Sequence, residues 1–360
     1  MTQPVVVDLP ALPRERGAAH GEQLRTAITS AVERWKDSLV ALDGGDPDAW
    51  IAAFLTGTDF VPAIERRTPA LLEEVRGLAD GAGLTFEDAF AFQLVDEQWC
   101  WTTRRRAEHE HCSTLGVVGS DDSPTLVAQN LDLPVWWEGL QTVMRYPAFE
   151  DDPGGVLVTA AGFIVMNGMN DAGVAIGVNA LPDVPSAVRG LPVAFVIRGA
   201  LASRSAAEAA AFVGRVDHAS GQNFTIGDRD GVLGVEADAD GTTAYDPSEG
   251  CVLHTNHAVE RMSGTSWRGV AGGALANSQA RLEFLALRRG TVRGVSDAIE
   301  VLSDDTVPIR RVPTDASPSS TFATCVYELG PSGPAAHVRG GTGQSDFVVV
   351  EPLTAAEPAR

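Results

Sequence analysis

Cys112 stands where a strongly polar stretch of the chain changes into an apolar one. The run AEHEH, residues 107–111, ends at this cysteine, and the STLGVVG that follows has the composition of a β-strand. A lone cysteine is most often a small buried hydrophobic residue. A cysteine at the start of a strand can also be a nucleophile that becomes exposed when the chain is cut before it. A nearby base then suffices to convert the thiol into a reactive thiolate.

Polar residues also end or interrupt two other apolar strands. Asn130 and Asp132 close the segment LVAQNLDLP, which we expect to form a hairpin with STLGVVG and so to return beside Cys112. The segment HTNH, residues 254–257, breaks a later strand. These polar positions are turn formers in one interpretation and neighbours of a reactive thiol in the other.

The histidines also allow a metal-site hypothesis. His254 and His257 lie three residues apart, but no carboxylate or thiol stands at a suitable spacing from them. A site built from His109, His111 and Cys112 would instead appear as stoichiometric metal in the purified protein. We expect neither arrangement, so the sequence predicts no metal ligands.

The elements that would position these residues change in kind near residue 110. Before it the patterns are helical, with apolar residues recurring every three or four positions. After residue 112 short apolar strands follow one another closely, which favours antiparallel pairing over parallel crossovers. Helical segments are expected over residues 20–42, 69–83, 84–99 with Thr85 as its cap, 192–216, 274–290 and 295–303.

Helices and strands that come in separate runs predict an α+β sandwich in which antiparallel sheets are covered by helices. The last strands are expected over residues 321–330, 335–340 and 346–353, and the Pro- and Ser-rich 312–320 is expected to be a long surface loop. The sequence contains no internal repeat and no interdomain linker. We therefore expect one domain over residues 1–360.

Composition and charge narrow the class of partner. The 360 residues are 44% hydrophobic and carry a formal net charge of -21, which disfavours nucleic acid and anionic membranes as partners. The N-terminal segment has no basic region followed by an apolar run, and no window approaches the roughly 18 apolar residues of a spanning helix. We therefore expect a cytoplasmic protein without a membrane partner. The single lysine among many arginines, alanines and glycines is typical of a GC-rich bacterial genome.

An ordered set of motifs runs over residues 15–340 of the chain: RGAAHGEQL, GLADGAGLTFEDAFAFQL, HCSTLG, LVAQNLDLP, GMNDAGVAIGVNAL, NFTIGDRDGVLGVEAD, HTNH and TFATCVYEL. In content and order this set resembles the acyl-coenzyme A:6-aminopenicillanic acid acyltransferase family, the C45 peptidase-like branch of the N-terminal nucleophile hydrolases. Gln129 stands where ceramidase-like relatives carry arginine, which favours the acyltransferase branch.

The resemblance implies a four-layer αββα sandwich of two antiparallel sheets and a precursor that cuts itself. The cut falls between His111 and Cys112 and gives an α chain of residues 1–111 and a β chain of residues 112–360, which stay associated. His111 replaces the glycine that the penicillin acyltransferase pattern has before the cut. Ser113, next to the nucleophile, is a candidate for assisting this processing.

The resemblance also implies the roles of three residues. The thiol of Cys112 attacks an amide carbonyl, and the freed α-amine, whose ordinary pKa is about 7.7 to 8.0, serves as the base. Asn256 matches the position whose side-chain amide stabilises the oxyanion. Asp132 matches the acidic residue that orients the new amine.

Four further residues are candidates for contacting substrate. Trp137 can line an acyl pocket or simply fill the core. Asp96 and Glu97 can meet a substrate ammonium or form a solvated helix end. Arg198 can hold a substrate carboxylate or pair with an acidic residue of the chain.

The sequence therefore predicts an autoproteolytic cysteine amidohydrolase or acyltransferase that acts on a linear amide of a small molecule through a Cys112 thioester. It requires no cofactor, although a coenzyme A thioester is possible as a co-substrate. The alternative is an uncleaved, non-catalytic binding protein of the same fold in which Cys112 is structural. The presence together of Cys112, Asp132 and Asn256 favours the enzyme, and the sequence does not indicate an oligomeric state.

Overall fold

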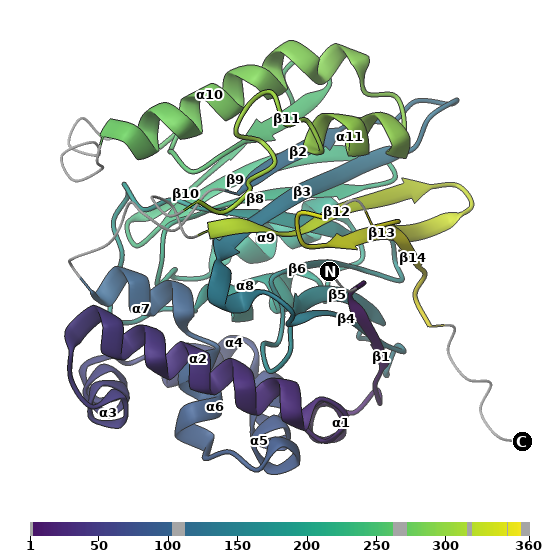
Figure 1. Ribbon diagram of the computed structural model, residues 1–360. Helices are drawn as coiled ribbons and strands as arrows, with labels where there is room; N and C mark the ends of the chain where they lie inside the picture. Colours follow the sequence, from purple (N-terminus) through teal and green to yellow (C-terminus); the bar gives the residue numbers. More distant parts are fainter. Residues whose placement is uncertain (1–2, 103–111, 262–271, 315–318, 344, 354–360) are drawn as a thin grey trace, which may run out of the picture.

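The computed structural model describes residues 3–102, 112–261, 272–314, 319–343 and 345–353. Two β-sheets stack face to face at the centre, and helices cover both outer faces (Figure 1). Helices α10 and α11 pack on the six-stranded sheet, and α9 packs on the outer face of the eight-stranded sheet, with α1–α7 beyond on the same side (Figure 1). The predicted α+β, four-layer αββα architecture is confirmed.

The eight-stranded sheet has the order β1-β4-β5-β6-β7-β8-β9-β10. All neighbouring pairs in it are antiparallel except β1 and β4, which run parallel. The expectation of purely antiparallel sheets is wrong at this edge, because β1 enters the sheet directly from the chain start rather than through a hairpin. The strands are β1 (Val5–Asp8), β4 (Gln141–Tyr146), β5 (Gly155–Ala160), β6 (Asn167–Asn170), β7 (Ala175–Ala180), β8 (Gln222–Asp228), β9 (Gly231–Asp238) and β10 (Gly241–Tyr245).

The six-stranded sheet carries the predicted hairpin and has the order β11-β2-β3-β12-β13-β14. Ser113 of β2 pairs with Asn130 of β3. Cys112 and Asp132 therefore lie at the same end of the hairpin, as expected. The strands are β2 (Ser113–Val117), β3 (Thr125–Pro134), β11 (Cys251–His254), β12 (Ser319–Gly330), β13 (Gly333–Gly340) and β14 (Val348–Val350).

The long helix expected over residues 20–42 is two helices. The first ends at Gln23, and the second begins at Arg25 because Leu24 departs from helical geometry with φ -114° and ψ 18°. The segment 84–99 is also divided, with a break between Phe92 and Val95, although Thr85 caps its start by accepting from Asp88 N–H at 3.1 Å. The helices before residue 112 are α1 (Pro13–Gln23), α2 (Arg25–Asp43), α3 (Pro47–Gly57), α4 (Val61–Arg67), α5 (Pro69–Ala82), α6 (Phe86–Phe92) and α7 (Val95–Trp101).

The later helices agree with the sequence pattern more closely. The block over residues 192–216 forms two helices, and a short 3-10 helix follows β3. The prediction of a surface loop over residues 312–320 is wrong at its C-terminal end, because Ser319 and Ser320 begin β12 and are buried. The later helices are α8 (Val193–Ala200), α9 (Ala206–Arg215), α10 (Gly272–Arg288) and α11 (Val295–Leu302), with 3-10 helices η1 (Val135–Trp137) and η2 (Arg289–Thr291).

The RGAAHGEQL motif is explained by the tight packing of α1 on α5. A Cβ atom added at Gly17 would lie 1.8 Å from the backbone oxygen of Glu74, and one added at Gly21 would lie 2.5 Å from the nitrogen of Ala82. Only glycine permits this approach of two backbones. The close contact brings Arg16 of α1 onto the Glu74 carboxylate, with Nε 2.9 Å from Oε2.

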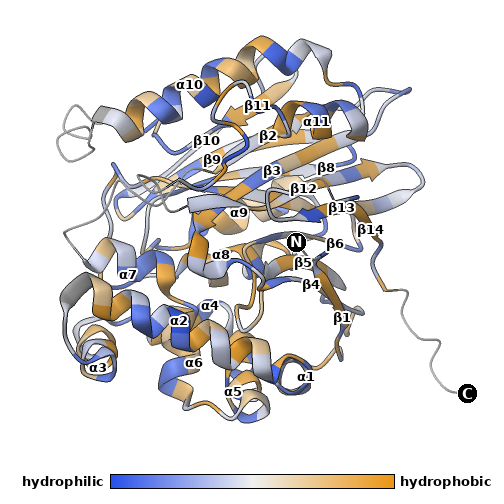
Figure 2. Ribbon diagram, viewed as in Figure 1, coloured by the Kyte–Doolittle hydropathy of each residue, from blue (hydrophilic) through white to orange (hydrophobic). Residues whose placement is uncertain are grey.

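The outer helical layer shows how hydropathy follows packing. Along α10, hydrophilic and hydrophobic residues alternate (Figure 2), as expected for a helix with one side toward solvent and one toward the sheet. Leu285 of α10 and Val301 of α11 pack with Leu115, Leu126 and other apolar side chains of the six-stranded sheet. No helix in the described part of the chain has the length and apolar character needed to cross a membrane.

Candidate active site

Cys112 lies directly before β2, at the edge of a small cavity. Its exposed fraction is 8%, and it lines a cavity of about 70 Å³. Asp132 lines the same cavity, so the hairpin delivers both predicted residues to one space. The apolar lining includes Val95, Leu131, Trp137, Phe163, Val178 and Ile197.

Asp132 is a fully buried carboxylate whose pKa is raised by its surroundings. Its Oδ1 accepts a hydrogen bond from Thr321 Oγ1 at 2.6 Å, and its Oδ2 has no partner among the described residues. Burial raises the pKa of Asp132 to about 6, although the Thr321 hydrogen bond and the charges of Arg281 and Arg311 act in the opposite direction. An unpaired carboxylate oxygen at this place can accept from an ammonium group.

Arg281 is the site residue that the sequence did not reveal. It is completely buried on α10, and its Nη1 donates to the carbonyl oxygen of Cys112 at 2.6 Å and to Ser113 Oγ at 2.9 Å. Its Nη2 donates to Asn256 Oδ1 at 3.1 Å. Burial lowers the pKa of Arg281 to about 10, opposed by the charges of Asp132 and Cys112. One guanidinium therefore connects the backbone of Cys112 with the side chain of Asn256.

Replacing Arg281 by methionine is expected to lower kcat/KM for amide substrates by about 100-fold, because Cys112 and Asn256 lose their shared anchor. Arg281→Lys keeps the positive charge and should recover part of the loss. A pH profile separates positioning from mere packing: loss of the cation beside Asp132 should move the acidic limb of the Arg281→Met profile to higher pH. An unchanged kcat/KM, or equal losses in both variants with no shift of the profile, would contradict this role.

Asn256 lies just after β11 and is held from both ends of its side chain. Its Nδ2 donates to the backbone oxygen of Ala180 at 3.0 Å, while its Oδ1 accepts from Arg281. The amide Nδ2 carries two hydrogens, so one of them is left for a further acceptor. Ser278 of α10 supports the backbone, because Asn256 N–H donates to its Oγ at 2.9 Å.

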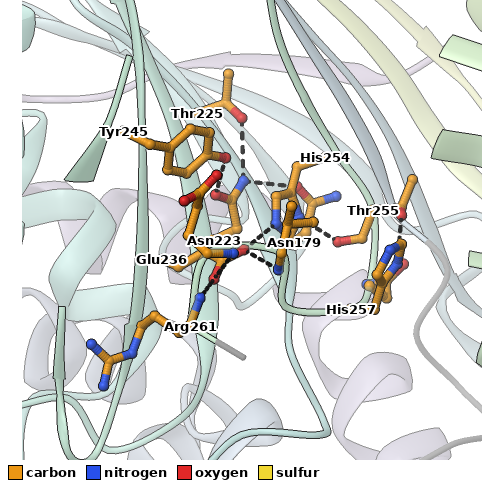
Figure 3. Close-up of polar contacts among 12 residues, drawn as sticks. Asn179, Asn223, Thr225, Glu236, Tyr245, His254, Thr255, His257 and Arg261 are labelled. Carbon is orange, nitrogen blue, oxygen red and sulfur yellow. Dashed lines mark hydrogen bonds and ion pairs between the residues drawn. The ribbon is translucent and has the colours of Figure 1, made fainter. Parts of the chain in front are cut away.

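The segment around Asn256 is anchored by Glu236 of β9, which Figure 3 shows between His254 and Arg261. Glu236 accepts from His254 Nε2 at 2.8 Å and from the backbone N–H groups of Val259, Glu260 and Arg261 at 2.6 to 3.0 Å. Burial favours the neutral acid, but these hydrogen bonds and the nearby His254 outweigh it and lower the pKa of Glu236. The HTNH segment is thus the end of β11 followed by a turn that hydrogen bonds to Glu236 hold in place. Among the described residues, no cluster of three or more histidine, cysteine, aspartate and glutamate side chains is arranged to hold a metal.

Asp96 and Glu97 lie in the first turn of α7, not at the solvated helix end that was one expectation. Asp96 lines the Cys112 cavity, and its Oδ1 accepts from Gln222 Nε2 at 3.3 Å. Glu97 is 3% exposed, and its Oε1 accepts from Ser220 Oγ at 2.7 Å and from Val193 N–H at 3.0 Å. Burial, reinforced by the charge of Asp96, raises the pKa of Glu97 to about 8.

Glu97 should make the stability of the protein fall as the pH rises. Because its pKa increases from 4.5 in the unfolded chain to about 8 in the fold, its stabilising contribution is complete below pH 4.5 and is lost as the pH rises through 8. Glu97→Gln cannot ionise and should gain about 1 to 3 kcal/mol over the wild type between pH 5.5 and 8.5. Urea unfolding at both pH values measures this, with the exposed Glu87→Gln as control. A wild-type slope that persists in Glu97→Gln would contradict it.

Of the other predicted residues, Trp137 lies at the Cys112 cavity and Asn130 does not. Trp137 lines the cavity and stacks on Trp136 with ring centroids 4.1 Å apart. Asn130 lies on the other face, where its Nδ2 donates to the backbone oxygens of Leu302 and Ile309 at 2.8 Å, so its role is structural. His111 lies outside the described residues.

Arg198 is not brought to Cys112. Its Nη1 and Nη2 bind Glu74 Oε1 and Oε2 at 2.7 and 2.8 Å, and its side chain is 3% exposed. It lines a separate groove of about 770 Å³ instead of the Cys112 cavity. Arg198 therefore pairs with an acidic residue of the chain, which was one of the two expectations. A substrate carboxylate bound at Cys112 would not reach Arg198.

This fold is that of the N-terminal nucleophile hydrolases, a class of hydrolases and acyltransferases. A conjugated bile acid hydrolase variant from Clostridium perfringens aligns with a TM-score of 0.50 at 11% identity, covering 67% of this chain and 92% of that chain. Another variant of the same enzyme gives 0.48 at 11% identity over the same shares. Penicillin V acylase from Agrobacterium tumefaciens gives 0.44 at 14% identity, covering 67% and 86%.

The family is established by sequence. The family described as acyl-coenzyme A:6-aminopenicillanic acid acyl-transferase matches residues 119–333, and the chain belongs to it. Comparison with curated proteins finds no match. The expected resemblance is confirmed, and it covers both Asp132 and Asn256.

Proposed function

We propose that the chain is an autoproteolytic, N-terminal cysteine amidohydrolase or acyltransferase of one domain that acts on linear amides of small molecules. The observation that carries this proposal is the contact of one buried guanidinium with the Cys112 carbonyl, the Ser113 hydroxyl and Asn256 Oδ1. This contact holds the cysteine backbone close to a side-chain amide beside a cavity, an arrangement that supports acyl transfer to sulfur.

Processing would begin at the bond between His111 and Cys112. The Cys112 thiol adds to the His111 carbonyl, the acyl group moves from nitrogen to sulfur, and the amide C–N bond breaks. Water then hydrolyses the thioester and leaves the His111 carboxylate, the free thiol and a new α-amine. Ser113, which follows Cys112 and whose Oγ accepts from Arg281, would assist the proton transfer.

Turnover would use the same thiol with the new α-amine as base. The amine takes the thiol proton, the thiolate attacks the substrate carbonyl, and the leaving amine departs with a proton. Asp132 Oδ2, which has no partner among the described residues, would accept a hydrogen bond from the α-ammonium. The second N–H of Asn256 Nδ2 would stabilise the tetrahedral oxyanion.

The thioester then passes its acyl group to an acceptor. Water as acceptor gives hydrolysis, and an amine gives acyl transfer; a coenzyme A thioester as donor would enter through the same Cys112 intermediate. The nucleophile, the base and the groups that stabilise charge would all come from the chain itself, so the proposed reaction requires no cofactor. The Arg281 and Asn256 contacts serve both outcomes equally, and hydrolysis follows wherever water is the acceptor present.

The test is the intact mass of the purified wild type under denaturing conditions. Cleavage before Cys112 gives pieces of 111 and 249 residues, the second number being 360 − 111. Sequencing the larger piece should begin Cys-Ser-Thr, and incubation with a slow amide substrate should add one acyl mass to it alone. A chain that stays whole after long incubation would contradict the proposal and favour a binding protein of this fold.

A further inference from the structure

Unpaired hydrogen-bond acceptors lie on one wall of the Cys112 cavity. Asp96 and Gln222 line the cavity together with Cys112. Gln222 is 2% exposed, and its Oε1 has no partner within the described part of the chain, while its Nε2 donates to Asp96 Oδ1. Buried carbonyl oxygens nearly always accept a hydrogen bond, so this wall lacks a donor that a ligand can bring.

The wall also carries net negative charge. The Asp96 carboxylate borders the cavity, and Glu97 lies behind it with Oε2 unpaired among the described residues. Burial raises the pKa of Asp96 to about 6 and that of Glu97 to about 8, so near neutral pH the pair holds one charge rather than two. No arginine or lysine lines this cavity in the described chain. One cation in the cavity would neutralise the negative charge of this wall.

This wall is structurally joined to the Asn256 side chain. Ala180 of β7 accepts from Asn256 Nδ2, and it pairs directly with Gln222 of β8. The position expected to bind the oxyanion is therefore linked to the acidic wall through Ala180, which contacts Asn256 and pairs with Gln222. A substrate whose carbonyl reaches the Cys112 thiol would extend its acyl group into the space that Asp96 and Gln222 line.

The cavity holds only a small group. Its volume of about 70 Å³ is roughly half that of a cavity that accommodates benzene, so about three to five non-hydrogen atoms fit. Most of its lining is apolar and buried, including Trp137 and Val178. The leaving amine must reach solvent, whereas the acyl group stays on Sγ as the thioester. A small, mostly apolar space next to Cys112 suits the retained acyl group.

We infer, on the basis of the proposed function, that the acyl group transferred to Cys112 is short and carries an ammonium that Asp96 and Gln222 Oε1 bind. The substrate class is thus an amide of a small amino acid, such as a β-alanyl amide. The charge contributes to selectivity because Asp96 is paired only with a neutral amide in its described contacts.

The inference can be tested without turnover by modifying Cys112 in the native protein. Aminoethyl methanethiosulfonate forms a Cys112 disulfide with the shape and charge of a β-alanyl thioester, and propyl methanethiosulfonate forms its neutral isostere. The thiolate attacks the sulfenyl sulfur and methanesulfinate leaves in both reactions. Peptide mass spectrometry gives the rate at Cys112 separately from the other cysteines.

We expect the aminoethyl-to-propyl rate ratio in the wild type to exceed that in Asp96→Asn by about tenfold, from one charge in a low-dielectric cavity. Asp121→Asn changes the net charge equally on an exposed turn and should leave the ratio unchanged. Gln222→Met, which keeps Asp96, should lower the ratio by about threefold and provides the test if Asp96→Asn does not fold. Equal ratios in wild type, Asp96→Asn and Gln222→Met, or a native Cys112 that reacts with neither reagent, would overturn the inference.

Turnover of β-alanyl and butyryl amides of 7-amino-4-methylcoumarin separates this inference from the proposed function. Preference for the β-alanyl amide that is lost in Asp96→Asn supports both. Equal turnover of the two amides by wild type and variant overturns the inference and keeps the enzyme. No turnover and no acylation of Cys112, with the reagent ratio still dependent on Asp96, supports the ammonium site and overturns the proposed function.

Discussion

Cys112→Ala is expected to leave the chain at its full 360 residues and to abolish amide turnover. Alanine has no thiol to attack the His111 carbonyl, so no α-amine is released and neither the nucleophile nor the base of the proposed reaction forms. Removing the nucleophile of an enzyme of this kind lowers kcat by about 10⁶-fold, which means a fall to background. Intact mass and a coupled amidase assay measure the two effects.

Controls separate chemistry from folding in this experiment. The exposed fraction of Cys112 is 8% and the side chain is small, so Cys112→Ala should unfold within about 1.5 kcal/mol of an uncut wild-type precursor. Cys251→Ala removes another buried thiol, one that lies on β11, and should be cleaved and active. Residual cleavage in Cys112→Ala, or inactive Cys251→Ala, would contradict the assignment of the nucleophile.

Glu74→Gln is expected to destabilise the protein by about 3 to 5 kcal/mol. Glu74 is buried and is the shared partner of Arg16 and Arg198, whose charges would be left without a counterion. Burial acts to raise the pKa of Glu74, but the two arginines outweigh it and lower the pKa to about 2. Since the pKa is depressed in the fold, this stabilisation is present above the ordinary glutamate pKa of 4.5 and is lost as the pH falls toward 2.

The neighbouring Glu73 is a matched control. It lies on the same helix and pairs with Arg14 and Arg76 at 3.0 and 2.7 Å, but its side chain is 46% exposed. Exposed ion pairs contribute about 0 to 1 kcal/mol, so Glu73→Gln should differ little from wild type in urea unfolding at pH 7. The gap between Glu74→Gln and wild type should narrow below pH 4. Equal effects of the two substitutions would contradict the buried-counterion account.

The sequence located the residues whose neighbours are close along the chain. The β2–β3 hairpin placed Cys112 beside the end of β3 because its register depends on local pairing. The Thr85 cap follows from its own side chain and the next turn. These features rely on short-range geometry, which residue type and spacing determine.

The residues that the sequence missed are those defined by distant partners. Arg281 lies in an amphipathic helix that also contains Arg288, and a charged residue there normally faces solvent. Its burial depends on a contact 169 positions away, with Cys112. The one available signal was its spacing of three residues from Ser278, which places both on the face that meets Asn256.

Arg198 and the break at Leu24 show the same limit. Arg198 interrupts an apolar helix face, which indicates a partner without indicating which one, and Glu74 lies 124 positions away. The pattern over residues 20–42 continues through Leu24, so no local residue signals the change of helix axis. Packing of α1 on α5, with Gly17 against Glu74, is the tertiary feature that fixes where the first helix runs.

The parallel pairing of β1 with β4 has a consequence for the cleaved protein. Val5 to Asp8 lie in register with Thr142 to Arg145, and Arg145 Nε binds Asp8 Oδ1 at 2.6 Å. A cut before Cys112 would turn this strand pairing into a contact between two separate polypeptides. The cleaved molecule would then be an obligate heterodimer, whose melting temperature depends on protein concentration while that of the uncut precursor does not.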